Sequence, residues 1–294
     1  MINDDKDGLH HLIEKELSSN DKILKPDFSQ RAGRELMVLY LQSKFNQLVN
    51  FDSKAHNPII SNVNSNFIQK FSRRLVSNPE KRIMIGITGE SACGKSTICK
   101  AISNVIRSFN MPVSILATDS YFNDISELIE KYGTFDNLRD AGYDVDSPKS
   151  FQLDILESDL KNLAAGNDIY APEYLPNGTG VSVPESKYIA SNKIIIVEGM
   201  ATMYDNIKEI FDIKVYVETD IDVRKERFLH RAFTERNQDF ENAKKHWNYI
   251  LTAGEKYVKP SRDYADLILN GNTNMEYFCQ LLEYLHTITN NFEV

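Results

Sequence analysis

The chain is poor in cysteine and has no long apolar run. Its three cysteines, at positions 93, 99 and 279, do not have the spacing of a metal site. Any disulfide scheme leaves one of them unpaired, so we expect a reducing compartment. No apolar segment approaches the length of a membrane span, and the first residues are acidic rather than basic as in a signal peptide. These absences predict a cytoplasmic protein without a membrane partner.

An excess of basic residues is also missing. The 34 lysines and arginines are outnumbered by 42 aspartates and glutamates, so the formal net charge is −8. Because nucleic-acid binding needs a basic face, this balance argues against nucleic acid as the main partner. The chain has 294 residues, of which 41% are hydrophobic and 26% charged, and this composition allows one large or two smaller globular domains.

The hydrophobic pattern changes near residue 80. Over 1–80 apolar residues recur every four positions, as at Leu9, Ile13 and Leu17, which predicts an all-helical extension for packing or homo-oligomer formation. Over 81–294 apolar strands alternate with helices, which predicts an α/β domain with a parallel sheet covered on both faces. The proline- and glycine-broken stretch at 169–189 predicts a hairpin insertion. We expect strands at 83–88, 113–118, 193–197, 213–217 and 267–269, and helices near 95–108, 151–165, 222–236, 240–257 and 275–289.

A complete phosphate loop follows the first predicted strand. The two glycines of a G-x-x-x-x-G-K-S motif let backbone N–H groups line a concavity for phosphate, and the next helix directs its positive end there. Lys95 is expected to reach the β- and γ-phosphates, and Ser96 Oγ to bind Mg²⁺. A glycine turn before an ordinary helix is the alternative, which the flanking strand and helix disfavour. The loop consists of Gly89, Glu90, Ser91, Ala92, Cys93, Gly94, Lys95, Ser96 and Thr97.

Two acids follow later strands of the predicted sheet. Asp119 comes at the end of the second strand and Glu198 directly after the third. An open α/β sheet binds ligands at the carboxyl ends of its strands, so both acids are expected beside the phosphates. Asp119 is the candidate general base for an attacking hydroxyl, and Glu198 the candidate for holding the Mg²⁺ shell. The alternatives are a turn or N-cap Asp and a solvated strand-end Glu.

Four arginines lie on or just beyond the helix predicted after Asp222. Helical spacing places the first three on one face, where they would clamp the transferring phosphoryl group as a lid over about 224–240 closes. A solvated, salt-bridged helix face is the alternative. The four are Arg224, Arg227, Arg231 and Arg236.

An ordered set of motifs over about residues 81–271 resembles the uridine kinase and phosphoribulokinase family. Beside the phosphate loop and the arginine helix, the set consists of 118–122, 144–151, 172–174, 196–199 and 257–267. The resemblance implies a P-loop NTPase-type fold and the use of ATP with Mg²⁺. It also implies roles for single residues. These are Asp119 as catalytic base, Asp146 as a ligand of substrate hydroxyls, Tyr174 as a wall of the substrate pocket, Glu198 near the metal, and Arg231 and Arg236 as lid residues that act with Lys95 in catalysis; Tyr121 and Phe122 are further substrate-binding candidates.

The departures from that family concentrate at the acceptor end. After Tyr174 the chain has no histidine where uridine kinases place one for the base, and Phe228 and Gln238 stand where that family places arginines. Each unpaired group at a buried base edge costs about 1–3 kcal/mol. We therefore expect the sugar hydroxyls to be recognised more strictly than the base. The long segment before the phosphate loop is also similar to that of bacterial type I pantothenate kinases.

The sequence as a whole predicts a kinase that transfers the γ-phosphoryl group of ATP to a hydroxyl of a small metabolite, with a nucleoside such as uridine or cytidine favoured. Pantothenate or a sugar phosphate is the alternative acceptor. From another class, the alternative is a catalytically degenerate ATP-binding module with a protein partner, although the presence of Asp119 speaks against it. A GTPase would carry an Asn-Lys-x-Asp guanine signature, and none occurs.

Overall fold

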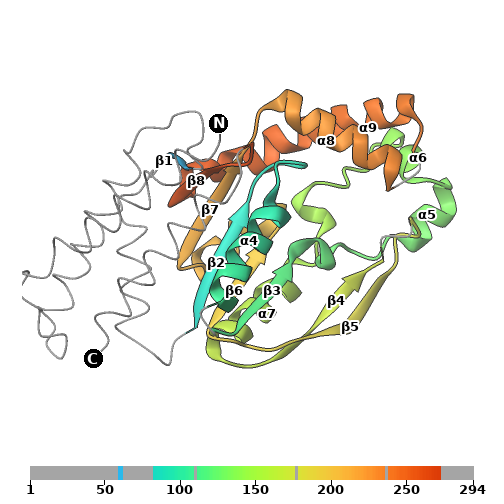
Figure 1. The fold of residues 1–294 in the computed structure, drawn as a ribbon. Helices are drawn as coiled ribbons and strands as arrows, with labels where there is room; N and C mark the ends of the chain where they lie inside the picture. The colour runs from blue at the N-terminus through green and yellow to red at the C-terminus, as the bar shows by residue number, and fades with distance from the viewer. Residues whose placement is uncertain (1–58, 62–81, 109–110, 176–177, 236–237, 273–294) are drawn as a thin grey trace, which may run out of the picture.

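The computed structural model describes residues 59–61, 82–108, 111–175, 178–235 and 238–272. Within them, six strands form one sheet in the order β1-β8-β7-β2-β6-β3 (Figure 1). Strand β1 pairs antiparallel with β8, and the other neighbours pair in parallel. The strands are β1 Ile59–Ser61, β2 Ile83–Thr88, β3 Val113–Ala117, β6 Ile194–Glu198, β7 Ile213–Glu218 and β8 Leu267–Asn270.

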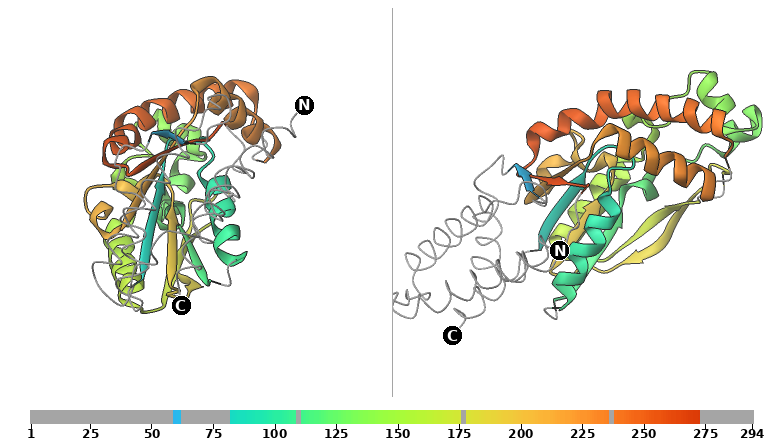
Figure 2. Two further views of the ribbon diagram at one scale, coloured as in Figure 1. Left: turned by 60° about the vertical axis from the view of Figure 1, so that its left-hand side comes forward. Right: turned by 45° about the horizontal axis from the view of Figure 1, so that its top comes forward.

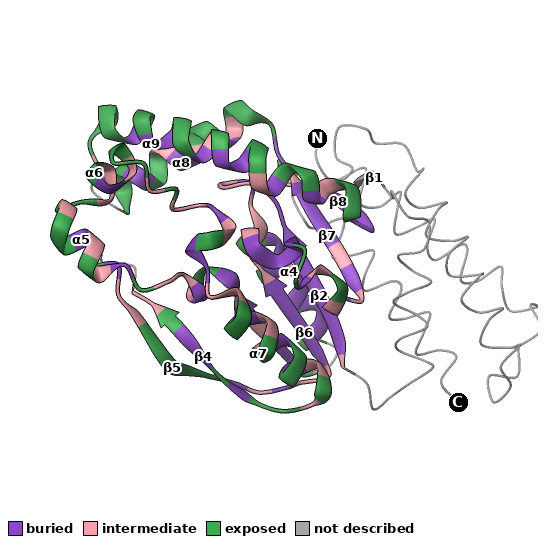
Figure 3. Cartoon of the chain, turned by 180° about the vertical axis from the view of Figure 1, so that it is seen from behind, coloured by how far each residue is buried: buried purple, intermediate pink, exposed green. Residues whose placement is uncertain are grey.

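The central strands are apolar along their length because helices cover both faces of the sheet. All six residues of β2 are buried, and so are the first four of β6 (Figure 3). Helix α4, Lys95–Ser108, lies on one face and helix α7, Leu153–Ala165, on the other (Figure 2, left). On the α7 side, leucines of the helix form one core with side chains of β2, β3 and β6. The predicted α/β fold is thereby confirmed.

The hairpin predicted at 169–189 is present as a separate two-stranded sheet. Strands β4, Ile169–Tyr174, and β5, Ser182–Ile189, pair antiparallel beside the main sheet (Figure 1). Their inward residues join the α7 core, whereas Tyr170 and Tyr188 lie exposed with ring centroids 5.4 Å apart. The buried residues of the hairpin lie mainly on β4, whereas β5 is exposed along most of its length.

Two helices lie across the carboxyl ends of the parallel strands (Figures 1 and 2). These are α8, Ile221–Thr234, and α9, Phe240–Ala253, which pack on each other through Phe228 and Trp247. A single π turn, Gly254–Val258, and a 3-10 turn, Lys259–Tyr264, continue α9 toward β8. The helix predicted near 240–257 thus changes geometry after Ala253.

Two short helices were not predicted from the pattern. They are α5, Ser126–Tyr132, and α6, Phe135–Asp140, and one or two turns are too short to give a clear period. The side chain of Thr134 caps α6 by accepting a hydrogen bond from Asn137 N. Both helices lie beside the far end of the α8–α9 pair (Figure 1).

The extension predicted to be all-helical includes one strand, because β1 extends the main sheet by pairing with β8. The remaining helical patterns of 1–80 and the helix predicted near 275–289 lie outside the described residues. Helix α7 begins two residues later than predicted, since Phe151 forms a β-bridge with Phe122. Among the described residues, none of the helices has the length and apolar character needed to cross a membrane.

Candidate active site

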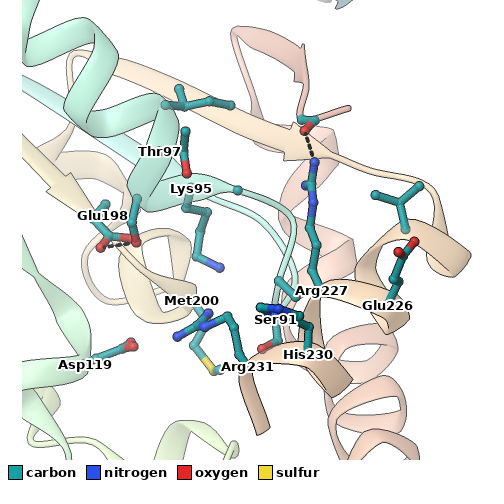
Figure 4. Close-up of a pocket in the computed structure, with 16 residues that line it drawn as sticks. Ser91, Lys95, Thr97, Asp119, Glu198, Met200, Glu226, Arg227, His230 and Arg231 are labelled. Atoms are coloured by element: carbon teal, nitrogen blue, oxygen red, sulfur yellow. Dashed lines mark hydrogen bonds between the residues drawn. The ribbon is translucent and has the colours of Figure 1, made fainter. Parts of the chain in front are cut away.

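A cavity of about 720 Å³ opens at the carboxyl ends of β2, β3 and β6. The phosphate loop and the start of α4 form one side of it, and α8 forms another (Figure 4). Asp119 and Glu198 stand at the sheet edge, across the cavity from the arginines of α8 (Figure 4). The residues lining it are Ser91, Ala92, Gly94, Lys95, Ser96, Thr97, Ile98, Asp119, Glu198, Met200, Val223, Glu226, Arg227, His230, Arg231 and Gly271.

The loop between β2 and α4 has the backbone conformation that the motif predicts. Gly89 has φ +148°, and a Cβ there would lie 2.5 Å from the carbonyl oxygen of Val217, so only glycine fits. Ala92 and Gly94 also have positive φ, at 62° and 100°. Lys95 Nζ donates hydrogen bonds to the carbonyls of Gly89, at 2.8 Å, and Glu90, at 3.1 Å. Its ammonium group is therefore held at the mouth of the loop, beside the concavity.

Ser96 and Glu198 form the second feature of the cavity. Ser96 Oγ donates a hydrogen bond of 3.0 Å to Glu198 Oε1. Burial raises the pKa of the Glu198 carboxyl above its ordinary value, and the charge of Asp119 adds to this, while Lys95 and Ser96 act in the opposite direction. Burial disfavours the charged form of this carboxyl, and a cation bound beside it would stabilise that form.

This pair fits Mg²⁺. The ion prefers oxygen ligands, and in nucleotide sites it is held by one or two protein groups together with phosphates and water. The described residues contain no group of three or more His, Cys, Asp or Glu side chains that would form an all-protein metal site. The hydroxyl of Ser96 and the carboxylate of Glu198 match the one or two protein ligands that Mg²⁺ has in nucleotide sites.

Asp119 reaches the same cavity from the neighbouring strand. It lies in a 3-10 turn, Thr118–Tyr121, directly after β3, and its side chain is exposed. Ala117 and Glu198 are register partners in the parallel pair β3–β6, which explains why the two acids emerge together. Both acids therefore line one cavity, at the ends of two neighbouring strands.

The acceptor-side candidates gather next to this turn. Phe122 stacks on Phe151, with ring centroids 4.3 Å apart, and lies 5.4 Å from the ring of Tyr174. Burial raises the pKa of Tyr174 to about 12, so its hydroxyl stays protonated at neutral pH. Asp146 acts electrostatically on Arg139, a partly buried residue of α6 that is ion-paired with Asp136 at 3.1 Å.

Tyr121 is a correction to the sequence prediction. Its side chain is completely buried, and its hydroxyl donates a hydrogen bond of 2.7 Å to Asp159 Oδ2 on α7. It belongs to the core between the Asp119 turn and α7, and it does not line the cavity. Its contribution is to fix the turn that carries Asp119.

The lid arginines separate into different environments. Arg227 and Arg231 line the cavity; Arg227 Nη2 donates to the carbonyl of Gly271 at 3.0 Å, and Arg231 Nε lies 3.3 Å from Glu235. Arg224 was predicted to share their face but is buried behind the phosphate loop, where it pairs with Glu90. The prediction failed there because helical spacing gives a broad face and not the neighbours of each position. Arg236 lies outside the described residues.

The structure also places the two lid residues that depart from the family pattern, Phe228 and Gln238. Phe228 is buried against the rings of His246 and Trp247. Gln238 lies 3.5 Å from both Asp136 of α6 and His246 of α9. Neither residue lines the cavity, so among the described residues the arginines that line it from α8 are Arg227 and Arg231.

Sequence reasoning missed several lining residues. Met200 follows Glu198-Gly199, and Gly271 follows β8, so their positions at strand ends were the available signal. His230 lies one residue before Arg231 on α8, and nothing in the spacing distinguished it from a solvent-facing residue.

Comparisons with known proteins agree with this geometry. The model of the phosphoribulokinase / uridine kinase family matches residues 84–275. A uridine kinase of Clostridium perfringens (strain SM101 / Type A) is 32% identical over 193 residues, 65% of this chain and 88% of that protein. Uridine-cytidine kinase A of Dictyostelium discoideum is 29% identical over 202 residues, 67% of this chain. The match covers only 38% of that relative, and one to uridine-cytidine kinase-like 1 of Mus musculus, 28% identical over 69% of this chain, covers 36%.

A solved structure supports the fold. That of a proposed fructose transport system kinase from Silicibacter sp. TM1040 aligns with a TM-score of 0.56 at 16% identity, over 68% of this chain and 95% of the other. The stretch that the family model matches contains the phosphate loop, both acids and the α8–α9 lid, and it makes up well over half of the sequence. The chain therefore belongs to the phosphoribulokinase / uridine kinase family.

Proposed function

We propose that the protein transfers the γ-phosphoryl group of ATP·Mg²⁺ to a hydroxyl of a small acceptor. The observation that carries this proposal is one cavity lined by the phosphate loop, by Asp119 and by the lid arginines. A phosphoryl-transfer enzyme needs these three elements, since its catalysis consists of positioning, a base for the nucleophile and neutralisation of charge.

Each of these side chains has its own role in the proposed reaction. Lys95 exchanges its contacts with the Gly89 and Glu90 carbonyls for the β- and γ-phosphates, beside the N–H groups of the loop. Asp119 accepts the proton of the attacking hydroxyl as that oxygen approaches the phosphorus. Arg227 and Arg231 neutralise the charge that spreads over the transferring group. Ser96 and Glu198 would hold Mg²⁺, which screens the phosphate charges when bound.

A ribonucleoside is the acceptor that we propose, with uridine or cytidine first. The names of the curated relatives point to it, and the aromatic rings of Phe122 and Tyr174 suit a flat base. Asp146 lies between Phe122 and Tyr174 in the sequence and is the proposed ligand of the ribose hydroxyls. We expect weak selection among bases for two reasons. No histidine follows Tyr174, and the side chain of Phe228 is buried between the lid helices.

Pantothenate or a sugar phosphate remains the rival acceptor, and an ATP-binding module with a protein partner the rival of another class. The module needs no general base, so the position of Asp119 in the cavity favours the enzyme. Assembly through residues 1–80 and residence in a reducing cytoplasm are further proposals that rest on composition alone.

A coupled ADP-release assay over nucleosides, pentose phosphates and pantothenate tests the proposal. We expect kcat/KM to vary little between uridine, cytidine and purine ribonucleosides, and to fall about tenfold or more for 2′-deoxy analogues, which lose one hydroxyl partner. Tolerance of deoxyribose with strong selection of uridine would contradict the assignment of Asp146. No acceptor-dependent ADP release with any compound, despite ATP binding, would favour the module.

A further inference from the structure

A buried ion pair lies behind the phosphate loop, on the side away from the cavity. Arg224 Nη1 of α8 is 2.7 Å from Glu90 Oε2, and the two side chains are only 3% and 13% exposed. Glu90 Oε1 and Arg224 Nη2 are buried without a hydrogen-bond partner among the residues that the structure describes. Burying two charges with unsatisfied atoms costs free energy that their attraction does not fully return. The pair is therefore poorly explained as a device for stability.

Arg224 also contacts the loop backbone. Its Nε donates a hydrogen bond of 3.0 Å to the carbonyl of Ser91. The guanidinium lies 5.6 Å from the ring centre of Trp247 on α9, and Gly254 packs so closely on Glu90 that a Cβ would be 2.8 Å from Oε1. Both members of the pair are thus held by the lid helices.

Fixing the Ser91 carbonyl has a geometric consequence. In a trans peptide the C=O of one residue and the N–H of the next point in opposite directions. The Ser91 carbonyl points to Arg224 behind the loop, so the N–H of Ala92 points to the cavity that Ala92 lines. Ala92 has φ +62°, which is unfavourable for a residue with a Cβ, so the neighbouring contacts must hold it.

A second carbonyl of the loop is held in the same way. Thr219 Oγ1, just before α8, donates a hydrogen bond of 2.8 Å to the carbonyl of Cys93. The N–H of Gly94 is directed away from it by the same geometry. The segment from Thr219 to Arg224 therefore fixes two peptides of the loop from outside.

We propose that Arg224 and Glu90 are a positioning pair that turns the Ser91–Ala92 peptide so that its N–H group faces the nucleotide phosphates. Neither side chain touches the nucleotide. Because Arg224 belongs to α8 and Glu90 to the phosphate loop, the position of the lid and the affinity of the loop for phosphate are linked. This inference rests on the proposed function only in taking ATP·Mg²⁺ as the ligand.

The test compares four variants with the wild-type chain: Arg224→Met, Glu90→Leu, the double variant and Arg224→Lys. Three quantities are measured for each variant. They are the melting temperature without nucleotide, the Kd for ATP·Mg²⁺ by calorimetry, and the KM for ATP and for the acceptor. Each single apolar replacement leaves an uncompensated buried charge, so both should melt earlier and bind ATP more weakly. Lys225→Met, at the next and exposed position of α8, is the matched control and should behave as wild type.

The double variant separates positioning from stability. Two apolar side chains restore the packing, so its melting temperature should return to that of the wild type, whereas its Kd for ATP should stay about tenfold higher because Ser91 keeps no donor. The acceptor KM should not change. Recovery of ATP affinity together with stability would overturn the proposal.

Arg224→Lys decides the question if the double variant does not fold. A lysine preserves the charge opposite Glu90 but lacks the second, rigidly placed donor for Ser91. We expect near wild-type melting with ATP affinity lowered several-fold; unchanged affinity would refute the inference. Failure of the wild-type chain to bind ATP would instead refute the proposed function.

Discussion

At the scale of a single residue, one buried hydrogen bond holds the side chain of Tyr121 in place. Its hydroxyl donates to Asp159, and burial together with this bond raises the pKa of the tyrosine. Burial raises the pKa of Asp159 as well, while the bond from Tyr121 acts against that rise. Tyr121 is the last residue of the Asp119 turn, so the bond fixes the start of the proposed acceptor side without touching an acceptor.

Tyr121→Phe should therefore lower stability and leave the acceptor KM unchanged. The loss at pH 7 should be about 1–2 kcal/mol, measured by urea denaturation. A carboxyl whose pKa is raised on folding loses stability as the pH rises through the range above its ordinary value. Without the tyrosine donor this rise is larger, so the variant should lose more stability at pH 7 than at pH 4.

Tyr188→Phe is the control, because Tyr188 makes the same kind of bond to Asp168 but is exposed. It should unfold as the wild type does. An acceptor KM raised tenfold in Tyr121→Phe, at wild-type stability, would restore Tyr121 as a substrate ligand.

The sequence identified residues whose position follows from the order of elements. Lys95 has a fixed place in the loop motif, and Asp119 and Glu198 come after strands, so the parallel sheet brings them together. Tyr121 and Arg224 could not be placed in this way. Their environments depend on Asp159 and Glu90, which lie on other elements and follow no local pattern.

At the scale of elements, α6 is joined to α9 by polar contacts. Asp140 accepts hydrogen bonds from Lys245 and from the hydroxyl of Tyr249, and these bonds lower its pKa. The next segment is joined too, since Tyr257 donates to Asp144 Oδ2 at 2.8 Å. The lid pair thus supports the stretch of chain that carries Asp146.

Asp140→Asn should raise the acceptor KM by less than about fivefold, because exposed ion pairs contribute little. The kcat and the KM for ATP should stay unchanged, since Asp140 is remote from the phosphate loop. High salt should reduce the difference from wild type by screening the pair.

Asp205→Asn provides the comparison, because Asp205 forms an exposed pair with Lys208 within one segment. Its kinetics should match the wild type. A changed KM for ATP in Asp140→Asn would show that the contact does not act on the acceptor side.

The elements were predicted unevenly. Strands buried on both faces give long apolar runs and were found within one or two residues, as in β2 and β6. Helices α5 and α6 were missed because they are short, and α6 is stabilised by a cap and by a contact with α9. The β1 strand depends on pairing with β8, far along the chain.

At the scale of the whole molecule, the lid connects the two halves of the site. Through Arg224 it contacts the phosphate loop, and through Lys245 and Tyr249 it contacts the acceptor-side helix. Asp119 lies after β3, in the cavity that the phosphate loop and α8 line (Figure 4). The proposed kinase activity requires such an arrangement, with nucleotide and acceptor brought to one carboxylate.

Single-turnover transfer of labelled γ-phosphate from ATP to the best acceptor of the panel, compared between wild type and Asp119→Asn, tests this account most directly. An asparagine keeps the size of the side chain but does not accept the proton. We expect an unchanged Kd for ATP·Mg²⁺ and transfer slowed by about 10²–10⁴-fold. Transfer by Asp119→Asn at the wild-type single-turnover rate would contradict the central claim, because the proton would then be taken by another group.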